Sequence, residues 1–136
     1  MSADNVRRVT VDHLTLPVTD LERSRAFYAA ALGALGFAVE RYEDTWVFGA
    51  PGSEDFAIAP GAPPTEGMHL AFAADPRAQV DAFHAAALAA GARDNGAPGE
   101  RPRYHPGYYA AYVLDPDANN VEAVCHERSE PGVVSP

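Results

Sequence analysis

The chain contains an internal repeat, and this repeat limits the folds it can adopt. The segment AFYAAAL at residues 26–32 returns as AFHAAAL at residues 82–88, 56 positions later. The same interval separates His13 from His69, and each histidine opens a strand-like run, HLTL or HLAF. The alanine-rich helical segment alone indicates only close packing on a sheet. Together with the repeated strand, it predicts two copies of one supersecondary unit related by a pseudo-twofold axis.

Each copy is predicted to run strand, helix and then further short strands. Alternating and β-branched residues indicate the strands, and apolar residues at helical spacing indicate the helices. Thr19 or Asp20 is expected to cap the first helix, and Asp75 the second, with Pro76 at its first position. The predicted strands are 9–17, 37–41, 45–50 and 55–60 in the first copy and 67–74, 108–114 and 120–126 in the second, where residues 95–107 are expected to form a long loop.

These elements predict one α+β domain over residues 1–136. Its first module covers about residues 9–60 and its second about residues 67–127, and residues 128–136 are expected to form a flexible tail.

Composition restricts the partners that this domain can have. The net charge is −9 and no basic stripe is present, so we expect no nucleic-acid partner. No apolar run reaches the length of a membrane span, and no signal peptide is recognisable, so we expect a cytoplasmic protein without membrane contact. Cys125 is the single cysteine, which fits a reducing compartment, and its place on the packing side of its strand predicts a small core residue.

Two histidines and one glutamate are predicted to face the same side of the sheet. Period-two alternation turns His13 and His69 away from the leucines that pack under the helices. In NVEAVCH, the same alternation places Val121, Ala123 and Cys125 on the packing face and Glu122 on the opposite one. Two imidazoles and one carboxylate on a concave sheet face form a typical facial triad for a divalent metal. A strand histidine that is merely hydrogen-bonded is the alternative interpretation.

The segments VDHLTLPVTDLERSRAFYAAALGALGF (residues 11–37) and YYAAYVLDPDANNVEAV (residues 108–124) resemble the opening and closing signatures of the vicinal oxygen chelate superfamily. This superfamily includes glyoxalase I, extradiol dioxygenases, fosfomycin-resistance enzymes, methylmalonyl-CoA epimerase and bleomycin-binding proteins. The resemblance covers about residues 9–127. It implies paired βαβββ modules that form a half-barrel sheet around a concave cavity, commonly in a homodimer. It also implies His13, His69 and Glu122 as metal ligands, which in several members come from two chains.

The sequence departs from this family pattern at two places. Where glyoxalase I and the epimerases carry a fourth ligand, the chain has Ala57, which cannot ligate, and nearby Asp55 is an alternative ligand or a solvated turn residue. The family usually has glycine at the position of Ala118, so Asn119 or Asn120 is expected to adopt the positive φ of that turn.

Further candidates lie around the second module. Tyr112 and Tyr108 are predicted to bind substrate, and ordinary packing is the alternative. Tyr112 and the predicted ligand Glu122 are also candidates for a catalytic role. His126 is a candidate general base, and His105 a candidate substrate-binding residue of a lid. Arg103, together with Arg101, is a candidate for contact with an anionic substrate, with solvated loop arginines as the alternative.

Besides a catalytically idle family member that serves a partner protein, the sequence leaves three functions open. The first is a metalloenzyme of the glyoxalase or dioxygenase kind, in which Fe(II), Mn(II), Ni(II) or Zn(II) chelates vicinal oxygens of a small molecule. The second is a metal-free binding protein of the bleomycin-resistance type for a cationic antibiotic, which the acidic composition favours. The third is a fosfomycin-resistance-type transferase, whose anionic substrates fit the net charge less well.

Overall fold

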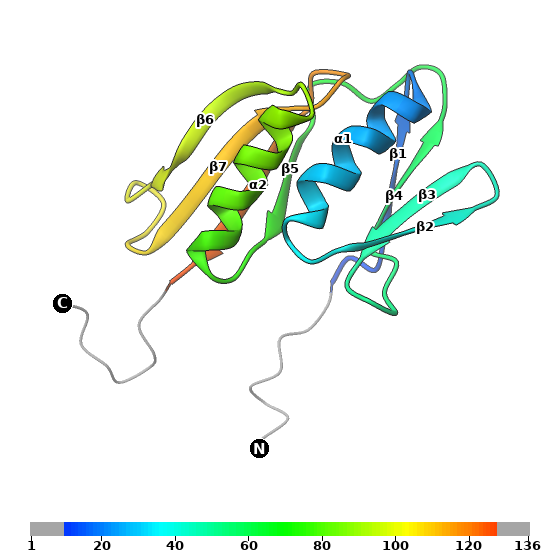
Figure 1. The fold of residues 1–136 in the computed structure, drawn as a ribbon. Coiled ribbons are helices and arrows are strands. Elements are labelled where there is room, and N and C mark those ends of the chain that lie inside the picture. Colours follow the sequence, from blue (N-terminus) through cyan, green and yellow to red (C-terminus); the bar gives the residue numbers. More distant parts are fainter. Residues whose placement is uncertain (1–9, 128–136) are drawn as a thin grey trace.

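The computed structural model describes residues 10–127, which form two successive βαβββ modules (Figure 1). The α+β class and the two-module organisation are therefore confirmed. The first module consists of β1 (Leu14–Val18), α1 (Leu21–Gly33), β2 (Ala38–Tyr42), β3 (Thr45–Gly49) and β4 (Phe56–Pro60). The second consists of β5 (His69–Ala73), α2 (Arg77–Ala89), β6 (Arg93–Glu100), β7 (Tyr108–Leu114) and β8 (Asn120–His126).

The two modules have the same sheet topology and the same strand register. The strand orders are β1-β4-β3-β2 and β5-β8-β7-β6, so each module forms its own mixed four-stranded sheet. The first and last strands of each module pair in parallel. Thr15 lies opposite Ala57 in module one, and Ala71 lies opposite Glu122 in module two. The pseudo-symmetry read from the sequence therefore extends to individual backbone pairs, and Glu122 takes the place that Ala57 has in module one.

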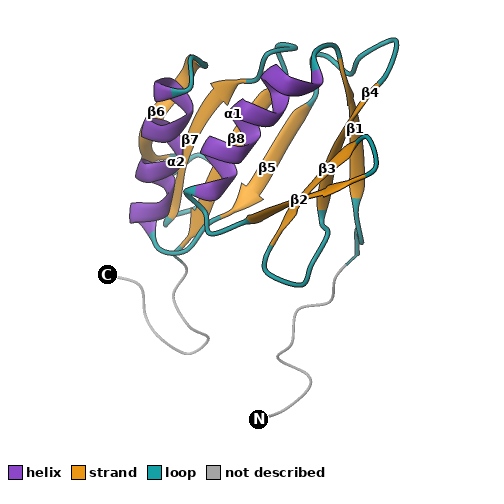
Figure 2. Ribbon diagram, turned by 45° about the vertical axis from the view of Figure 1, so that its right-hand side comes forward, coloured by secondary structure: helices purple, strands orange, loops and turns teal. Residues whose placement is uncertain are grey.

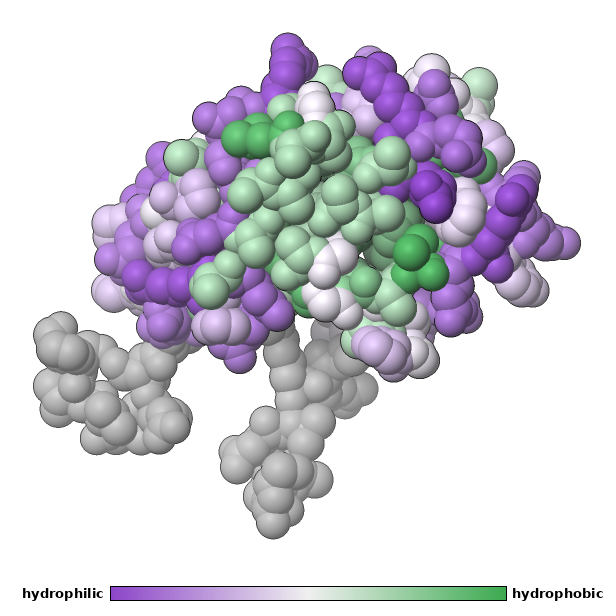
Figure 3. Space-filling view, viewed as in Figure 1, coloured by the Kyte–Doolittle hydropathy of each residue, from purple (hydrophilic) through white to green (hydrophobic). Residues whose placement is uncertain are grey.

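Helices α1 and α2 lie beside each other on one side of the two sheets (Figure 2). Their outward surface is rich in alanine and mildly apolar, with hydrophilic side chains around it (Figure 3). Among the described residues, neither helix is long and apolar enough to span a membrane.

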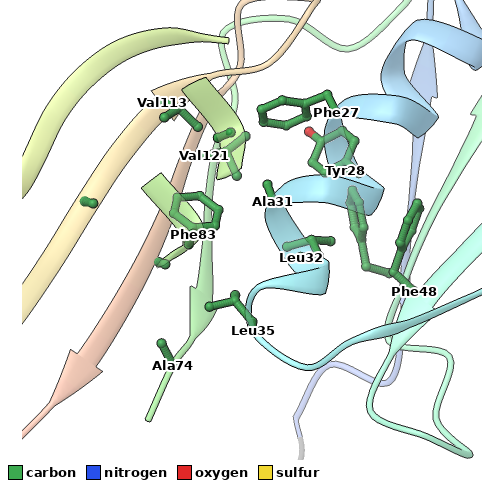
Figure 4. Packing of buried hydrophobic residues seen from close by; sticks show 14 of the residues in the cluster. Phe27, Tyr28, Ala31, Leu32, Leu35, Phe48, Ala74, Phe83, Val113 and Val121 are labelled. Carbon is green, nitrogen blue, oxygen red and sulfur yellow. The ribbon is translucent and has the colours of Figure 1, made fainter. Parts of the chain in front are cut away.

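One hydrophobic core joins both modules beneath the helices. Phe27 and Leu32 from α1 and Phe83 from α2 are buried in it together with residues of both sheets (Figure 4). Phe72 of β5 packs edge-on against Phe56 of β4, with ring centroids 5.2 Å apart. Because burial of such a side chain contributes about 1.5–3 kcal/mol, this continuous core explains how two small modules stabilise each other.

The predicted faces of the last strand are confirmed. Val121, Ala123 and Cys125 belong to the main core, whereas Glu122 and Val124 face the other side of the sheet. Burial raises the pKa of the Cys125 thiol, as expected of a core cysteine.

Three predicted boundaries differ from the structure. Strand β1 begins at Leu14, one residue after His13. Helix α2 begins at Arg77, so Pro76 occupies the N-cap and not the predicted first helical position, and no side chain caps the helix. The backbone N–H of Asp75 donates to the side chain of Gln79. The predicted cap at Asp75 is therefore wrong.

The predicted loop at residues 95–107 is also partly wrong, since β6 extends to Glu100. Its pairing with β7 shifts register twice, once between Asp94 and Gly96 and again between Gly96 and Gly99. An edge strand tolerates the glycines and the proline of this segment at such irregularities. The predicted flexible tail at residues 128–136 lies outside the described residues.

A buried hydrogen-bond network connects α1 to the turn between β7 and β8. The Tyr28 hydroxyl donates to Oδ2 of Asp115 at 2.5 Å, and the Asn119 side-chain amide donates to the same oxygen at 2.9 Å. Asn119 also accepts a bond from the backbone N–H of Met68 and donates to the carbonyl of Thr65. The network thus ties module one, the connecting segment and module two to one carboxylate.

We expect Tyr28→Phe to lower the free energy of unfolding by about 1–3 kcal/mol, because it removes a buried hydrogen bond to Asp115. Burial, and then the Asp115 charge, raise the pKa of Tyr28 well above its ordinary value of 10.0. The bond therefore stabilises the fold fully below about pH 10 and progressively less as the pH rises above it. Urea unfolding of both proteins at neutral pH and above pH 10 should give a difference that shrinks in alkali. A difference that grows with pH would contradict this account.

The β7–β8 turn contains a left-handed residue at an unexpected position. Ala118 itself has a φ of 66°, so the expectation that Asn119 or Asn120 takes this conformation is wrong. Asn119 is held by the hydrogen bonds just described, and Asn120 already belongs to β8, so neither is free to do so.

We expect Ala118→Gly to raise the free energy of unfolding by about 0.5–1 kcal/mol, because glycine relieves the left-handed strain at a smaller entropic cost. Ala85, exposed in the middle of α2, provides the matched control, and Ala85→Gly should lower stability by about 1 kcal/mol. Chemical denaturation of the two variants measures both effects. Equal destabilisation by the two substitutions would show that Ala118 carries no strain.

Candidate functional site

A buried carboxylate lies at the centre of the candidate site. Glu122 points from β8 to the face of the second sheet that the helices do not cover, and it has no exposed surface. Its Oε1 lies 2.7 Å from Nε2 of His69, and its Oε2 accepts a hydrogen bond of 2.5 Å from the Tyr108 hydroxyl. Three strands, β5, β7 and β8, therefore contribute to one polar cluster, as the strand alternation predicted for His69 and Glu122.

The hydrogen bonds to His69 and Tyr108 offset the cost of burying the Glu122 carboxylate. A buried carboxylate is costly unless hydrogen bonds replace its hydration, and each oxygen of Glu122 has a partner. Burial raises the pKa of Tyr108 most, followed by the hydrogen bond to Glu122 and its negative charge. The hydroxyl therefore remains protonated at neutral pH and continues to donate. The His69 side chain is about half exposed, at 55%, so its ring is accessible from solvent.

Tyr112 provides an unpaired polar atom beside this cluster. It lies directly opposite Glu122 in the β7–β8 ladder, and its ring centroid is 6.2 Å from that of His69. Only 9% of the residue is exposed, and its hydroxyl is buried without a hydrogen-bond partner. Burial, and then the charge of Glu122, raise the pKa of Tyr112. A buried neutral hydroxyl without a partner is suited to bind an oxygen atom of a ligand.

An open pocket of about 460 Å³ lies next to these residues. Gly96 is required in its wall, because a Cβ at this position would lie 2.7 Å from the Tyr112 ring. The pocket is lined by His69, Asn95, Gly96, Arg101, Arg103, Tyr104, Tyr112 and Asn120. Its size suits a small molecule.

The third predicted ligand lies elsewhere in the chain. His13 is exposed just before β1, and its Nδ1 contacts the carboxylate of Asp12 at 2.7 Å. Within residues 10–127, no group of three or more His, Cys, Asp or Glu side chains could hold a metal ion. One chain thus supplies His69 and Glu122 as a pair, and the three-ligand site stays a prediction. Asp55 is exposed and accepts a hydrogen bond from Ser53.

The other predicted residues divide between the pocket and its surroundings. Arg103 lines the pocket. The Nε2 of His105 and the Nδ1 of His126 lie 2.9 Å apart, and both rings pack edge-on against Tyr108. Neither histidine lines the pocket, so they contact the site through the Tyr108 ring, and their roles as base and lid residue stay predictions.

Sequence reasoning missed part of the pocket wall. Asn95 and Gly96 fell in the segment interpreted as a loop, although Gly96 belongs to the irregular part of β6. Asn120 was considered only for its turn, yet it lies opposite His69 and accepts a hydrogen bond from Asn95. The parity argument that located Glu122 could have found Asn120, since both lie on β8 two residues apart.

Comparison with known proteins identifies the superfamily to which the chain belongs. A family model described as "Glyoxalase/Bleomycin resistance protein/Dioxygenase superfamily" matches residues 10–123. The chain therefore belongs to this superfamily, as its sequence signatures predicted. A comparison with curated protein sequences gives no match.

Solved structures agree with this assignment. A glyoxalase/bleomycin resistance protein from Albidiferax ferrireducens T118 is 34% identical, with a TM-score of 0.74 over 86% of this chain and 98% of that one. A glyoxalase/bleomycin resistance protein/dioxygenase family enzyme from Burkholderia phytofirmans PsJN is 22% identical, with a TM-score of 0.65 over 87% and 99% of the two chains. Lactoylglutathione lyase from Agrobacterium tumefaciens is 19% identical, with a TM-score of 0.62 over 88% and 96%. The last two similarities show the fold alone.

Proposed function

We propose that this protein is a divalent-metal enzyme that acts on a small molecule with vicinal oxygens. The observation that carries the proposal is the pairing of His69 and Glu122 at 2.7 Å beside the unpartnered buried hydroxyl of Tyr112. Imidazole nitrogen and carboxylate oxygen are ligands for Fe(II), Mn(II), Ni(II) and Zn(II), so this donor pair fits such an ion.

The complete ligand set would come from two copies of the chain. His69 and Glu122 would hold the metal together with His13 of a second copy in a homodimer. His13 is suited to this role because its side chain is 66% exposed and Asp12 is its one polar partner among residues 10–127. When bound, the metal would act as a Lewis acid that stabilises negative charge on the substrate oxygens.

The remaining residues position the reacting groups. Tyr108 fixes the second carboxylate oxygen of Glu122 through its 2.5 Å hydrogen bond, and thereby the orientation of this side chain. Tyr112 would offer its hydroxyl proton to a substrate oxygen beside His69. Because its pKa is raised, this proton stays on the hydroxyl at neutral pH, so Tyr112 acts as a hydrogen-bond donor and not as a base.

The pocket lining argues against binding of a cationic antibiotic. The acidic composition favours a cation at long range, but two arginine side chains lie in the pocket wall itself. At contact distance these two guanidinium groups outnumber the one carboxylate beside the pocket, Glu122, and would repel a cationic ligand.

Glu122→Gln should lower the affinity for divalent metal at least about tenfold, because it removes a charged ligand while an amide keeps the size of the side chain. Glu54→Gln, at an exposed position in the β3–β4 loop, is the matched control and should bind as the unmodified protein does. Equilibrium dialysis against Mn(II), Ni(II), Zn(II) and anaerobic Fe(II), followed by elemental analysis, measures the occupancy. Circular dichroism verifies the fold of each variant.

Two outcomes would contradict the proposal. One is an unmodified protein that takes up none of the four metals. The other is a Glu122→Gln variant that retains full occupancy.

A further inference from the structure

The pocket beside His69 is locally basic in an acidic protein. The chain has 19 acidic and 10 basic residues, yet Arg101 and Arg103 are the fully charged side chains among the pocket-lining residues. Among the described residues, Arg77 is the arginine that forms ion pairs, with Glu100 and Glu127. Arg101 and Arg103 therefore lie in a pocket wall whose lining residues include no carboxylate, and neither forms an ion pair among the described residues.

Arg101 is held in place by backbone atoms. It donates to the carbonyl of Ala97 at 2.8 Å and to that of Glu100 at 3.4 Å. Its guanidinium lies 5.3 Å from the centroid of the Tyr112 ring. A Cβ at Gly99 would come within 3.0 Å of the guanidinium, so this glycine leaves the space that the arginine occupies. The positive charge is thus fixed next to the residue with the unpartnered hydroxyl.

Arg103 is held by an aromatic side chain. It donates to the Tyr104 hydroxyl at 3.0 Å and lies 4.9 Å from the centroid of that ring. Tyr104 in turn contacts Tyr108, with ring centroids 4.7 Å apart. The bond to Tyr104 is the one hydrogen bond of the Arg103 side chain within the described residues. Most N–H donors of Arg103 therefore remain available to a ligand.

We infer that the pocket recognises a carboxylate group of the substrate. The planar guanidinium groups of Arg101 and Arg103 together match the two oxygens of a carboxylate, and the pre-ordering of both side chains lowers the entropic cost of binding. The inference rests on the proposed function only for the other end of the substrate, whose vicinal oxygens would face His69 and Glu122. The substrate class is then a small carboxylic acid that also carries two adjacent oxygens.

Binding to metal-free protein tests this inference separately from the metal. The probes are 3,4-dihydroxybenzoate and its uncharged counterpart 3,4-dihydroxybenzamide, measured by calorimetry on protein dialysed against a chelator. We expect the carboxylate to bind about tenfold more tightly than the amide, because charge-assisted hydrogen bonds to arginine are lost in the amide. Arg103→Gln and Arg101→Gln should each reduce this preference several-fold.

The control is Arg23→Gln, which removes the same charge from an exposed position on α1 and should keep the full preference. Circular dichroism checks that each variant is folded, and Arg103→Gln is decisive if Arg101→Gln disturbs the β6–β7 segment.

Equal binding of both probes, binding of neither, or a preference unchanged in folded Arg103→Gln protein would overturn the inference. Since no metal is present, failure of the metal site leaves this result unaffected. Failure here leaves a metal enzyme for an uncharged substrate.

Discussion

The buried carboxylate of Glu122 is the constraint on which the rest of the site depends. A carboxylate without exposed surface requires hydrogen-bond donors, and His69 from β5 and Tyr108 from β7 provide them at 2.7 and 2.5 Å. These contacts fix side chains from three strands on one face of the sheet. The pairing of β7 with β8 places Tyr112, the cross-strand neighbour of Glu122, next to them with a buried hydroxyl that has no hydrogen-bond partner. The chemistry proposed for the protein follows from this arrangement.

The two modules share a scaffold but differ in their chemistry. Their parallel strand pairs have the same register, and their helices cover the same side of the core. At the position equivalent to Glu122, however, module one has the buried Ala57. Module one can therefore contribute His13 to a metal site but no carboxylate from this position. Because His13 lies away from the pair of His69 and Glu122 within the described part of the chain, a complete three-ligand site would need a second copy.

Features that depend on neighbouring residues could be predicted from the sequence. The repeat gave the two modules, and strand alternation placed Glu122 and His69 on one face with Val121, Ala123 and Cys125 on the other. Features that depend on distant contacts could not be predicted. Ala118 has the left-handed conformation, while the neighbouring Asn119 side chain is bound to Met68 and Thr65, which lie 51 and 54 positions away in the sequence. The pocket wall was missed because β6 contains glycines and a proline, which are typical of loops. The position of His13 relative to the other predicted ligands could not be predicted either, because it depends on how modules or copies of the chain pack together.

The central claim is that each site combines His13 of one copy with His69 and Glu122 of another, and mixing two inactive variants tests it most directly. His13→Ala and Glu122→Gln proteins, unfolded together and refolded as a mixture, would form mixed dimers. The account predicts that either variant alone takes up little metal at the concentration that fills the unmodified protein. The mixture should recover about one quarter of the unmodified occupancy, because half of the dimers are mixed and each has one intact site. A mixture that binds no more metal than its separate components would contradict a site shared between copies.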